Sequence, residues 1–476
     1  MNGVYENPLC TRYAGEEMKK IFSADNKFST WRKLWVALAE SEKELGLDIT
    51  DSQIAQMKEH IYDIDYDRAA EYESRFRHDV MAHVHTYGEA CPLAKPVIHL
   101  GATSCYVGDN TDIILMKEAM LRIKTLLVST IAVIGDFAEK YKDVPTLAFT
   151  HFQAAQPTTV GKRACLWAQD LIMDLEHLDF VLDSLKLLGC KGTTGTGASF
   201  LELFEGDGEK VKKLEKLIAK KMGFEACVSV SGQTYSRKTD YFVMSVLSGI
   251  AQSASKFAND IRLLSHLKEF DEPFESGQIG SSAMAYKRNP MRSERICALA
   301  RYVMTDSLNP AITAATQWLE RSLDDSANKR ISIPEGFLAT DGILNLYMNI
   351  ISGGTIYPYV TRKHLNEELP FMATENIIMY CTRKGGDRQE LHEAVREISV
   401  EVTKRIKLEG CDNDLLERIL NDKRFDLTEH ELNKIMDINN FVGLAPQQAE
   451  EFIENNIKPV LKKNSDFLGA EAQINV

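Results

Sequence analysis

The stretch NTDIILMKEAMLRIKTLLVSTIAVIGDFAEKYKD, residues 110–143, decides the fold of this chain. It contains no proline and only one glycine, Gly135. Its apolar residues, among them Ile114, Leu121, Leu127 and Ile131, recur at intervals near multiples of 3.6. That periodicity predicts one long helix with an apolar stripe along its side.

Four further segments predict long helices for the same reason. They are residues 158–188, 239–270, 292–322 with a kink at Pro310, and 335–351. Helices far longer than the usual 11–12 residues or so indicate a bundle whose apolar stripes continue into a subunit interface. The sequence therefore predicts an all-α oligomer.

Proline and glycine divide the chain around this bundle. Residues 30–45 and 51–88 are helical in pattern, and Pro92, Pro96 and Gly101 follow them. Gly353, Gly354 and Pro358 follow the last long helix. We expect three mostly helical domains at residues 1–103, 104–356 and 357–476, with strand signals only near residues 226–230 and Ile98.

The composition excludes several classes of protein. The chain has 476 residues, of which 44% are hydrophobic, and a net charge of −13 that disfavours nucleic acid or an anionic membrane as a partner. No apolar run approaches the roughly 18 residues of a membrane span. Nine cysteines without a C-x-x-C pair fit reduced thiols. We expect a cytoplasmic protein that binds small anions in a local basic pocket.

The segment GSSAMAYKRNP, residues 280–290, carries the densest chemistry of the chain. It resembles the signature loop of the fumarase/aspartase superfamily, whose chemistry is elimination of fumarate. Such a reaction needs a base, an acid and stabilisation of a doubly charged carboxylate. A loop can hold Ser281 or Ser282 as the base, with Lys287 as the electrostatic group and Asn289 as a neutral donor.

Histidines outside this loop are the candidates for the acid. His151 stands in THFQAAQP, which we expect directly before a long helix, where helix N-terminal donors favour an anionic ligand. Arg77 and His78 are candidate anion ligands. A metal site at His83 and His85 is disfavoured, because these residues point about 200° apart on a helix.

Two other segments have alternative interpretations. KGTTGTG from Lys191 lacks Walker spacing, so a glycine-rich loop between helices is the better interpretation. Arg321, Ser326 and Arg330 can grip a phosphate, although a solvated patch of charges explains them equally well. Thr103 and Ser104 offer hydroxyls at a turn, which is a weak signal alone.

Longer motifs then identify a family. THFQAAQPTTVGKRACLWAQDL from Thr150, KGTTGTGASF from Lys191, LFEGD from Leu203 and NPMRSER from Asn289 are similar to the adenylosuccinate lyases, in particular their animal-type branch. The resemblance covers nearly the whole chain. It implies an all-α homotetramer whose active sites form where three subunits meet, each contributing one segment.

The resemblance also implies residue roles. It makes Ser281 the base, His151 the acid, His78 a ligand that supports the acid, and Glu294 a group that orients a histidine. The implied substrate-binding residues are Arg12, Tyr13, Arg77, His78, Asp79, Thr103, Ser104, Gln233, Lys287, Asn289, Arg295, Arg321, Ser326 and Arg330. One departure is Ala285, where the family's loop usually has proline, and we expect a modest cost in turnover or affinity.

The implied function is cleavage of adenylosuccinate to AMP and fumarate, and of SAICAR to AICAR and fumarate, without metal or organic cofactor. Another lyase of the superfamily, such as argininosuccinate lyase, would share the loop but need a different pocket. A noncatalytic, crystallin-like relative and a metal hydrolase built on the histidine cluster are more distant alternatives.

Overall fold

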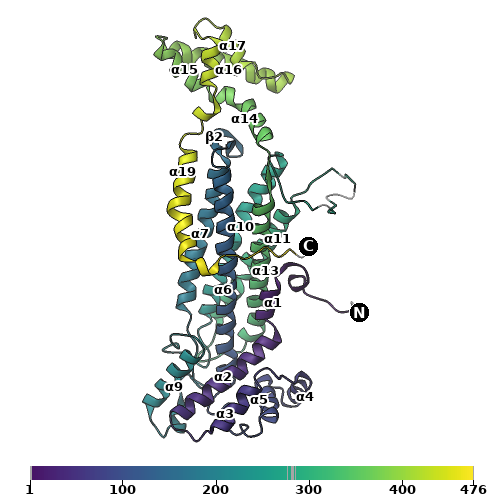
Figure 1. Ribbon diagram of the computed structural model, residues 1–476, viewed down its shortest axis with the longest axis vertical. Helices are drawn as coiled ribbons and strands as arrows, with labels where there is room; N and C mark the ends of the chain where they lie inside the picture. The colour runs from purple at the N-terminus through teal and green to yellow at the C-terminus, as the bar shows by residue number, and fades with distance from the viewer. Residues whose placement is uncertain (1–2, 276, 280–282, 285, 475–476) are drawn as a thin grey trace.

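The protein is a long bundle of helices, as the sequence predicts. The computed structural model describes residues 3–275, 277–279, 283–284 and 286–474. Figure 1 shows the long helices running along the vertical axis of the molecule. They are α6 (Ser104–Lys140), α7 (Val160–Ser184), α10 (Lys238–His266), α11 (Met291–Asp306) and α13 (Asp325–Gly353). None of the described helices is both long and apolar enough to cross a membrane.

One apolar core runs through the bundle and continues into the N-terminal helices. The 37 residues of α6 supply many of its buried side chains, from Cys105 to Ala138. Helices α6 and α7 meet closely at Gly161, where a Cβ atom would lie 2.3 Å from the carbonyl oxygen of Ala138. The bundle is therefore held by burial of the apolar stripes.

The N-terminal helices gather at one end of the bundle (Figure 1). The predicted helical segment 51–88 is divided into three helices. Asp65 caps the second of these and His78 caps the third, while Arg77 between them has a left-handed backbone with φ 53°. The elements at this end are α2 (Ala24–Glu44), α3 (Asp51–Glu59), α4 (Tyr66–Phe76), α5 (Asp79–Ala90), α8 (Ala198–Leu203) and α9 (Gly208–Lys221). The first elements of the chain, η1 (Leu9–Tyr13) and α1 (Glu16–Ile21), lie farther along the bundle, where both contact α13 (Figure 1).

The opposite end carries a β-hairpin and a second, smaller core. Strands β1 (Pro145–Thr150) and β2 (Gln153–Thr159) pair antiparallel, and β3 (Phe270–Asp271) pairs with β4 (Thr355–Ile356). The smaller core lies among α14 (Pro358–Met372), α15 (Thr374–Arg383), α16 (Arg388–Glu409), α17 (Leu415–Asn421) and α18 (Glu429–Ile435), which η2 (Ile438–Asn440) follows.

The last part of the chain returns to the bundle. Helix α19 (Ala445–Phe452) and η3 (Ile453–Ile457) pack on α6 and α7. Helix α20 (Lys458–Lys463) and η4 (Ser465–Phe467) then lead to a tail beside the bundle. In that tail the Gln473 N–H donates to Asn345 Oδ1 at 2.8 Å. The division at residues 103 and 356 stays a prediction.

Three local expectations are wrong. Segment 292–322 is broken at Ser307 rather than kinked at Pro310, which lies in the first turn of α12 (Leu308–Thr316), where its missing N–H costs nothing. Residues 226–230 contribute only an isolated bridge between Leu187 and Cys227, and Ile98 lies in a turn. The hairpin around His151 was not expected.

Candidate active site

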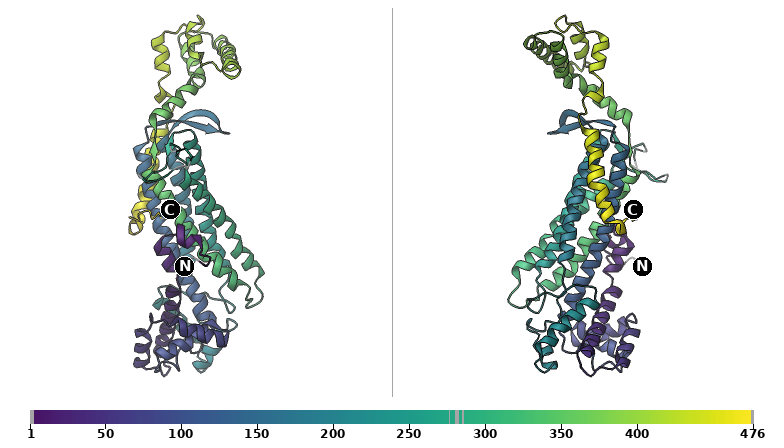
Figure 2. Two further views of the ribbon diagram at one scale, coloured as in Figure 1. Left: turned by 90° about the vertical axis from the view of Figure 1, so that its right-hand side faces the viewer. Right: turned by 60° about the vertical axis from the view of Figure 1, so that its left-hand side comes forward.

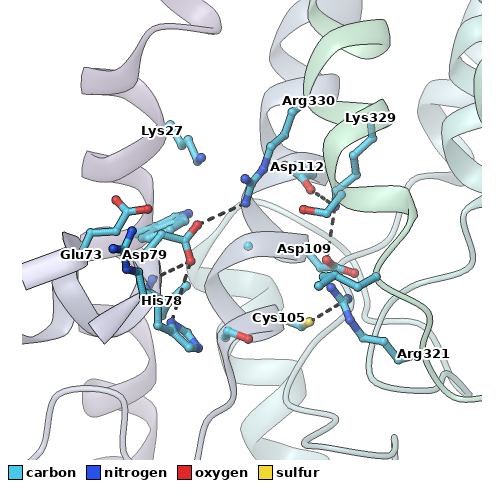
Figure 3. A pocket seen from close by; sticks show the side chains of 17 residues that line it. Lys27, Glu73, His78, Asp79, Cys105, Asp109, Asp112, Arg321, Lys329 and Arg330 are labelled. Carbon is cyan, nitrogen blue, oxygen red and sulfur yellow. Dashed lines mark hydrogen bonds and ion pairs between the residues drawn. The ribbon is translucent and has the colours of Figure 1, made fainter. Parts of the chain in front are cut away.

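A cavity of about 410 Å³ opens between the N-terminal helices and the near end of the bundle. Figure 3 shows its side chains converging from α2, α5, α6 and α13. Three helices begin at this cavity. Its lining includes His78, Ser104 and Ser326, which stand at the starts of α5, α6 and α13. The positive end of the dipole at each helix start favours an anion there.

His78 is held by the helix that it caps. Its Nδ1 accepts a hydrogen bond of 3.2 Å from the Met81 N–H and lies 3.9 Å from Asp79 Oδ1. A neutral ring in this position carries its proton on Nε2. Asp79 also accepts from Arg330 Nη2 at 3.2 Å, which ties the starts of α5 and α13 together across the cavity (Figure 3).

Several cations of the cavity lack a carboxylate partner. Among the residues that the structure describes, neither Arg77 nor Arg321 forms an ion pair with a carboxylate. Arg321 instead donates a hydrogen bond from its Nη1 to Cys105 Sγ at 3.2 Å. Burial, with Asp109 next, raises the pKa of Cys105 to about 11, so this thiol stays protonated at neutral pH. The guanidinium groups remain available to an anionic ligand.

A buried ionic network forms the floor of the cavity. Asp109 Oδ1 lies 3.0 Å from Arg237 Nη2 and 3.5 Å from Lys329 Nζ, which is 2.5 Å from Asp112 Oδ2. Arg237 also binds Asp325 Oδ2 at 2.6 Å. Burial favours the neutral form of Asp109, but Lys329 and Arg237 outweigh it and lower the pKa of this carboxyl. The network fixes the starts of α6 and α13 relative to α10.

A second group of predicted residues lies farther along the bundle. Arg295 stands over the Tyr13 ring with its guanidinium carbon 5.8 Å from the centroid. It lines a separate cavity of about 380 Å³ with Gly277 and Gln278. Arg12 lies beside Tyr13 in η1, which packs on α13. These residues belong to a region near the signature loop.

Glu272 anchors the base of the signature loop. Its Oε2 accepts from the Arg292 N–H at 2.9 Å, and its Oε1 accepts from the Ser293 N–H and hydroxyl at 2.7 and 2.6 Å. A carboxylate thus satisfies the first N–H groups of α11. Burial raises the pKa of Glu272 despite these bonds.

The loop itself carries the predicted base. Ser281 lies outside the described residues, as do Ser282 and Ala285. Lys287 is exposed, and its N–H donates to the Met284 carbonyl at 2.9 Å. Asn289 is half-buried just before α11, and Glu294 is exposed in the first turn of that helix.

The predicted acid, His151, is at the tip of the hairpin. The pairing of Thr150 with Gln153 leaves a two-residue turn, and its residues His151 and Phe152 have φ values of 54° and 57°. The expectation that His151 directly precedes a helix is wrong, because α7 begins only at Val160, after β2. Both turn residues are exposed, so the hairpin presents the imidazole to its surroundings.

The structure separates three groups of site residues in one chain. Ser104 begins α6, and the hairpin follows its other end. A helix of 37 residues spans about 55 Å, and Figure 1 shows the hairpin at the opposite end of the bundle from α5. The cavity brings together Arg77, His78, Asp79, Ser104, Arg321, Ser326 and Arg330.

Two predicted residues border this cavity without being among its lining side chains. Thr103 precedes α6, and the Gln233 N–H donates to the carbonyl of Glu320, next to Arg321, at 3.0 Å. Sequence reasoning missed Lys27, Asp112 and Lys329, which do line it. No local motif marks these three residues, because only the packing of α2, α6 and α13 brings them together.

Family models and full-length relatives agree with one another. A family model described as lyase matches residues 13–305, and a model described as adenylosuccinate lyase C-terminus matches residues 370–452. The chain is 52% identical to adenylosuccinate lyase of Schizosaccharomyces pombe, with 96% of each chain covered. It is 50% identical to adenylosuccinate lyase of Saccharomyces cerevisiae, with 98% of each covered.

Solved structures show the same fold at lower identity. A 3-carboxy-cis,cis-muconate lactonizing enzyme from Pseudomonas putida is similar with a TM-score of 0.82 and 21% identity, over 95% of this chain and 100% of that one. A fumarate lyase from Mesorhizobium has a TM-score of 0.79 and 21% identity, over 95% of this chain and 100% of that one. At this identity the likeness establishes the architecture alone.

Proposed function

This chain belongs to the adenylosuccinate lyase family, and from that premise we propose how its residues carry out the reaction. The enzyme is a C–N lyase that eliminates fumarate from adenylosuccinate and leaves AMP. The same elimination converts SAICAR to AICAR. The relatives favour this function over argininosuccinate lyase or a noncatalytic structural role.

The cavity at the three helix starts is the proposed phosphate and nucleotide site, and it is the observation that carries the proposal. Its volume of about 410 Å³ falls within the ~300–1,000 Å³ of small-molecule sites. Arg321 and Arg330 supply guanidinium groups, and Ser326 supplies a hydroxyl at the start of α13. Ser104 and Thr103 add hydroxyls at the start of α6, and Gln233 adds an amide close by.

The elimination itself needs two proton transfers. Ser281 as the base removes a proton from the carbon beside a carboxylate, and that electron pair forms the double bond of fumarate. The C–N bond breaks, and His151 as the acid donates a proton to the departing nitrogen. Lys287 and Asn289 stabilise the negative charge that collects on the carboxylate in between.

His78 and Glu294 position the acid. His78 has Nδ1 occupied by the Met81 N–H, so its Nε2–H is the group that can face a ligand or a second histidine. Glu294 is exposed at the start of α11 and is the proposed acceptor that orients a histidine. Both act through another group, which makes them positioning residues.

An assembled homotetramer completes the site. His151 and the cavity lie at opposite ends of α6 in one chain, so a hairpin from another copy must reach the cavity. The region of Arg12, Tyr13, Arg295 and the signature loop supplies the third part. Exposed apolar residues along α7, namely Leu166, Met173 and Phe180 at intervals of seven, support a helical interface. A cytoplasmic location stays a prediction.

The direct test follows ultraviolet absorbance when purified protein is mixed with adenylosuccinate, with AMP and fumarate identified afterwards. Argininosuccinate is run in parallel. We expect conversion of adenylosuccinate alone. Conversion of argininosuccinate instead, or of neither compound, would contradict the proposed function.

A further inference from the structure

Lys27 is a cation of the cavity to which neither the sequence motifs nor the family resemblance gives a role. It lies in the first turns of α2 and lines the cavity with Lys329 and Arg330 of α13. Figure 3 shows its ammonium group pointing from α2 toward the side of the cavity where Arg330 lies. Lys27 therefore faces the proposed phosphate site from the wall opposite α13.

The two carboxylates that favour the charge of Lys27, Asp79 and Asp112, are bound by other cations. Asp79 pairs with Arg330 at 3.2 Å, and Asp112 pairs with Lys329 at 2.5 Å. Among the residues that the structure describes, Lys27 has no ion pair with a carboxylate. It lies instead over two aromatic rings, with Nζ 5.1 Å from the centroid of Phe28 and 5.3 Å from that of Trp31. Such contacts hold a cation weakly.

The surroundings of Lys27 disfavour its charge. Burial is the largest cause that lowers the pKa of this lysine, and Arg330 is the next. A partly buried ammonium without a counter-ion costs stability, whereas a dianionic ligand between α2 and α13 would remove both penalties. Perturbed pKa values cluster at functional sites.

We propose that Lys27 is a further substrate-binding residue, which contacts the phosphate of the nucleotide from α2 while Ser326 and Arg330 contact it from α13. The inference rests on the proposed function, because it assumes a nucleotide monophosphate in this cavity. Lys27 then closes the phosphate site on the side that the helix starts leave open. It takes no part in the proton transfers.

Product inhibition separates the two halves of the substrate. AMP carries the phosphate, whereas fumarate carries only carboxylates. The inhibition constants of both products are therefore measured for the unaltered protein and for Lys27→Met. One charge-assisted hydrogen bond corresponds to about 10–100-fold in affinity. We expect the inhibition constant of AMP and the KM of adenylosuccinate to rise by about that factor. The inhibition constant of fumarate and kcat should stay within about threefold.

Lys33→Met is the matched control, because Lys33 is on the same helix but lines a different cavity. Lys27→Arg, which keeps the charge, should recover most of the AMP affinity. Lys27→Gln replaces Lys27→Met if the latter does not fold. Unchanged AMP inhibition in a folded, uncharged variant, or an equal loss for AMP and fumarate, overturns the role of Lys27. Absence of lyase activity in the unaltered protein would instead contradict the proposed function.

Discussion

The two ends of α6 carry different kinds of candidate site residues. At its start, a cavity lined by paired and unpaired charges lies over a buried network of Asp109, Arg237 and Lys329. Beyond its other end, a two-residue turn exposes His151 with little around it. The proposed phosphate-binding residues thus lie together in one chain, while the proposed acid is presented outward, and this difference is the reason we propose that another copy of the chain supplies the acid.

The largest expected effect is at the hairpin. His151→Gln keeps a polar side chain in the turn but removes the acid. We expect kcat for adenylosuccinate to fall by about 10²–10⁴-fold, the usual contribution of a positioned acid, with KM within a few-fold. Steady-state kinetics of the purified variant checks this, and a kcat within threefold of the unaltered protein would remove His151 from the mechanism.

At the cavity we expect the opposite kinetic pattern, in which the main change is in KM rather than in kcat. Arg330→Met removes both a proposed phosphate ligand and the partner of Asp79. KM should rise by about 10–100-fold while kcat changes far less, because charge-assisted bonds to the phosphate act on binding. Arg388→Met, at an exposed position on α16, is the control. A loss confined to kcat would show that the two ends of α6 do not divide the work as proposed.

The buried network predicts an effect on stability. Asp109→Asn leaves Arg237 and Lys329 without their shared partner, which should cost about 3–5 kcal/mol in the free energy of unfolding. Asp112→Asn is the comparison, because its pair with Lys329 is partly exposed and should cost about 1 kcal/mol or less. Denaturant unfolding of both variants measures the difference. Equal costs would contradict the role of Asp109 as the shared partner of Arg237 and Lys329.

The pH dependence of Asp109 has a definite sign. Its pKa in the folded protein is below the usual value, so its stabilisation is present above the unfolded pKa of about 3.9 and is lost as pH falls through the folded pKa. We expect the acid-unfolding curve of Asp109→Asn to be flatter than that of the unaltered protein below this unfolded pKa. Parallel curves would argue against a charged Asp109.

The smallest expected effect concerns backbone strain at the hairpin tip. Phe152 has φ 57°, a conformation that glycine adopts without strain. Phe152→Gly should remove this strain and so raise the free energy of opening the hairpin. The increase should be about 1 kcal/mol or less, because the greater freedom of glycine in the opened chain offsets part of it. Amide hydrogen exchange in β1 and β2 measures this. Faster exchange would show that the Phe152 ring, not its backbone, governs the turn.

Helix periodicity predicted the architecture well because it is a local signal. Segment 110–143 lies almost entirely within α6, and 239–270 closely matches α10. The hairpin was missed because THFQAAQP has no strand alternation, and its turn uses His151 and Phe152 where glycine or asparagine is usual.

The candidate site could be predicted only in part. Motifs identified His78, Arg321 and Arg330, which the cavity does bring together. Lys27 and Lys329 carry no motif and enter the site only through packing of α2 and α13. Which copy of the chain supplies each segment depends on assembly, a property that no local pattern encodes.

The central claim is that one copy supplies the cavity and another supplies the acid. It is tested by unfolding and refolding a one-to-one mixture of Arg330→Met and His151→Gln, each nearly inactive alone under a low concentration of adenylosuccinate. Random assembly should restore roughly a quarter of the activity of the unaltered protein, because that share of sites receives both intact parts. Activity no greater than that of the separately refolded variants would contradict the shared site.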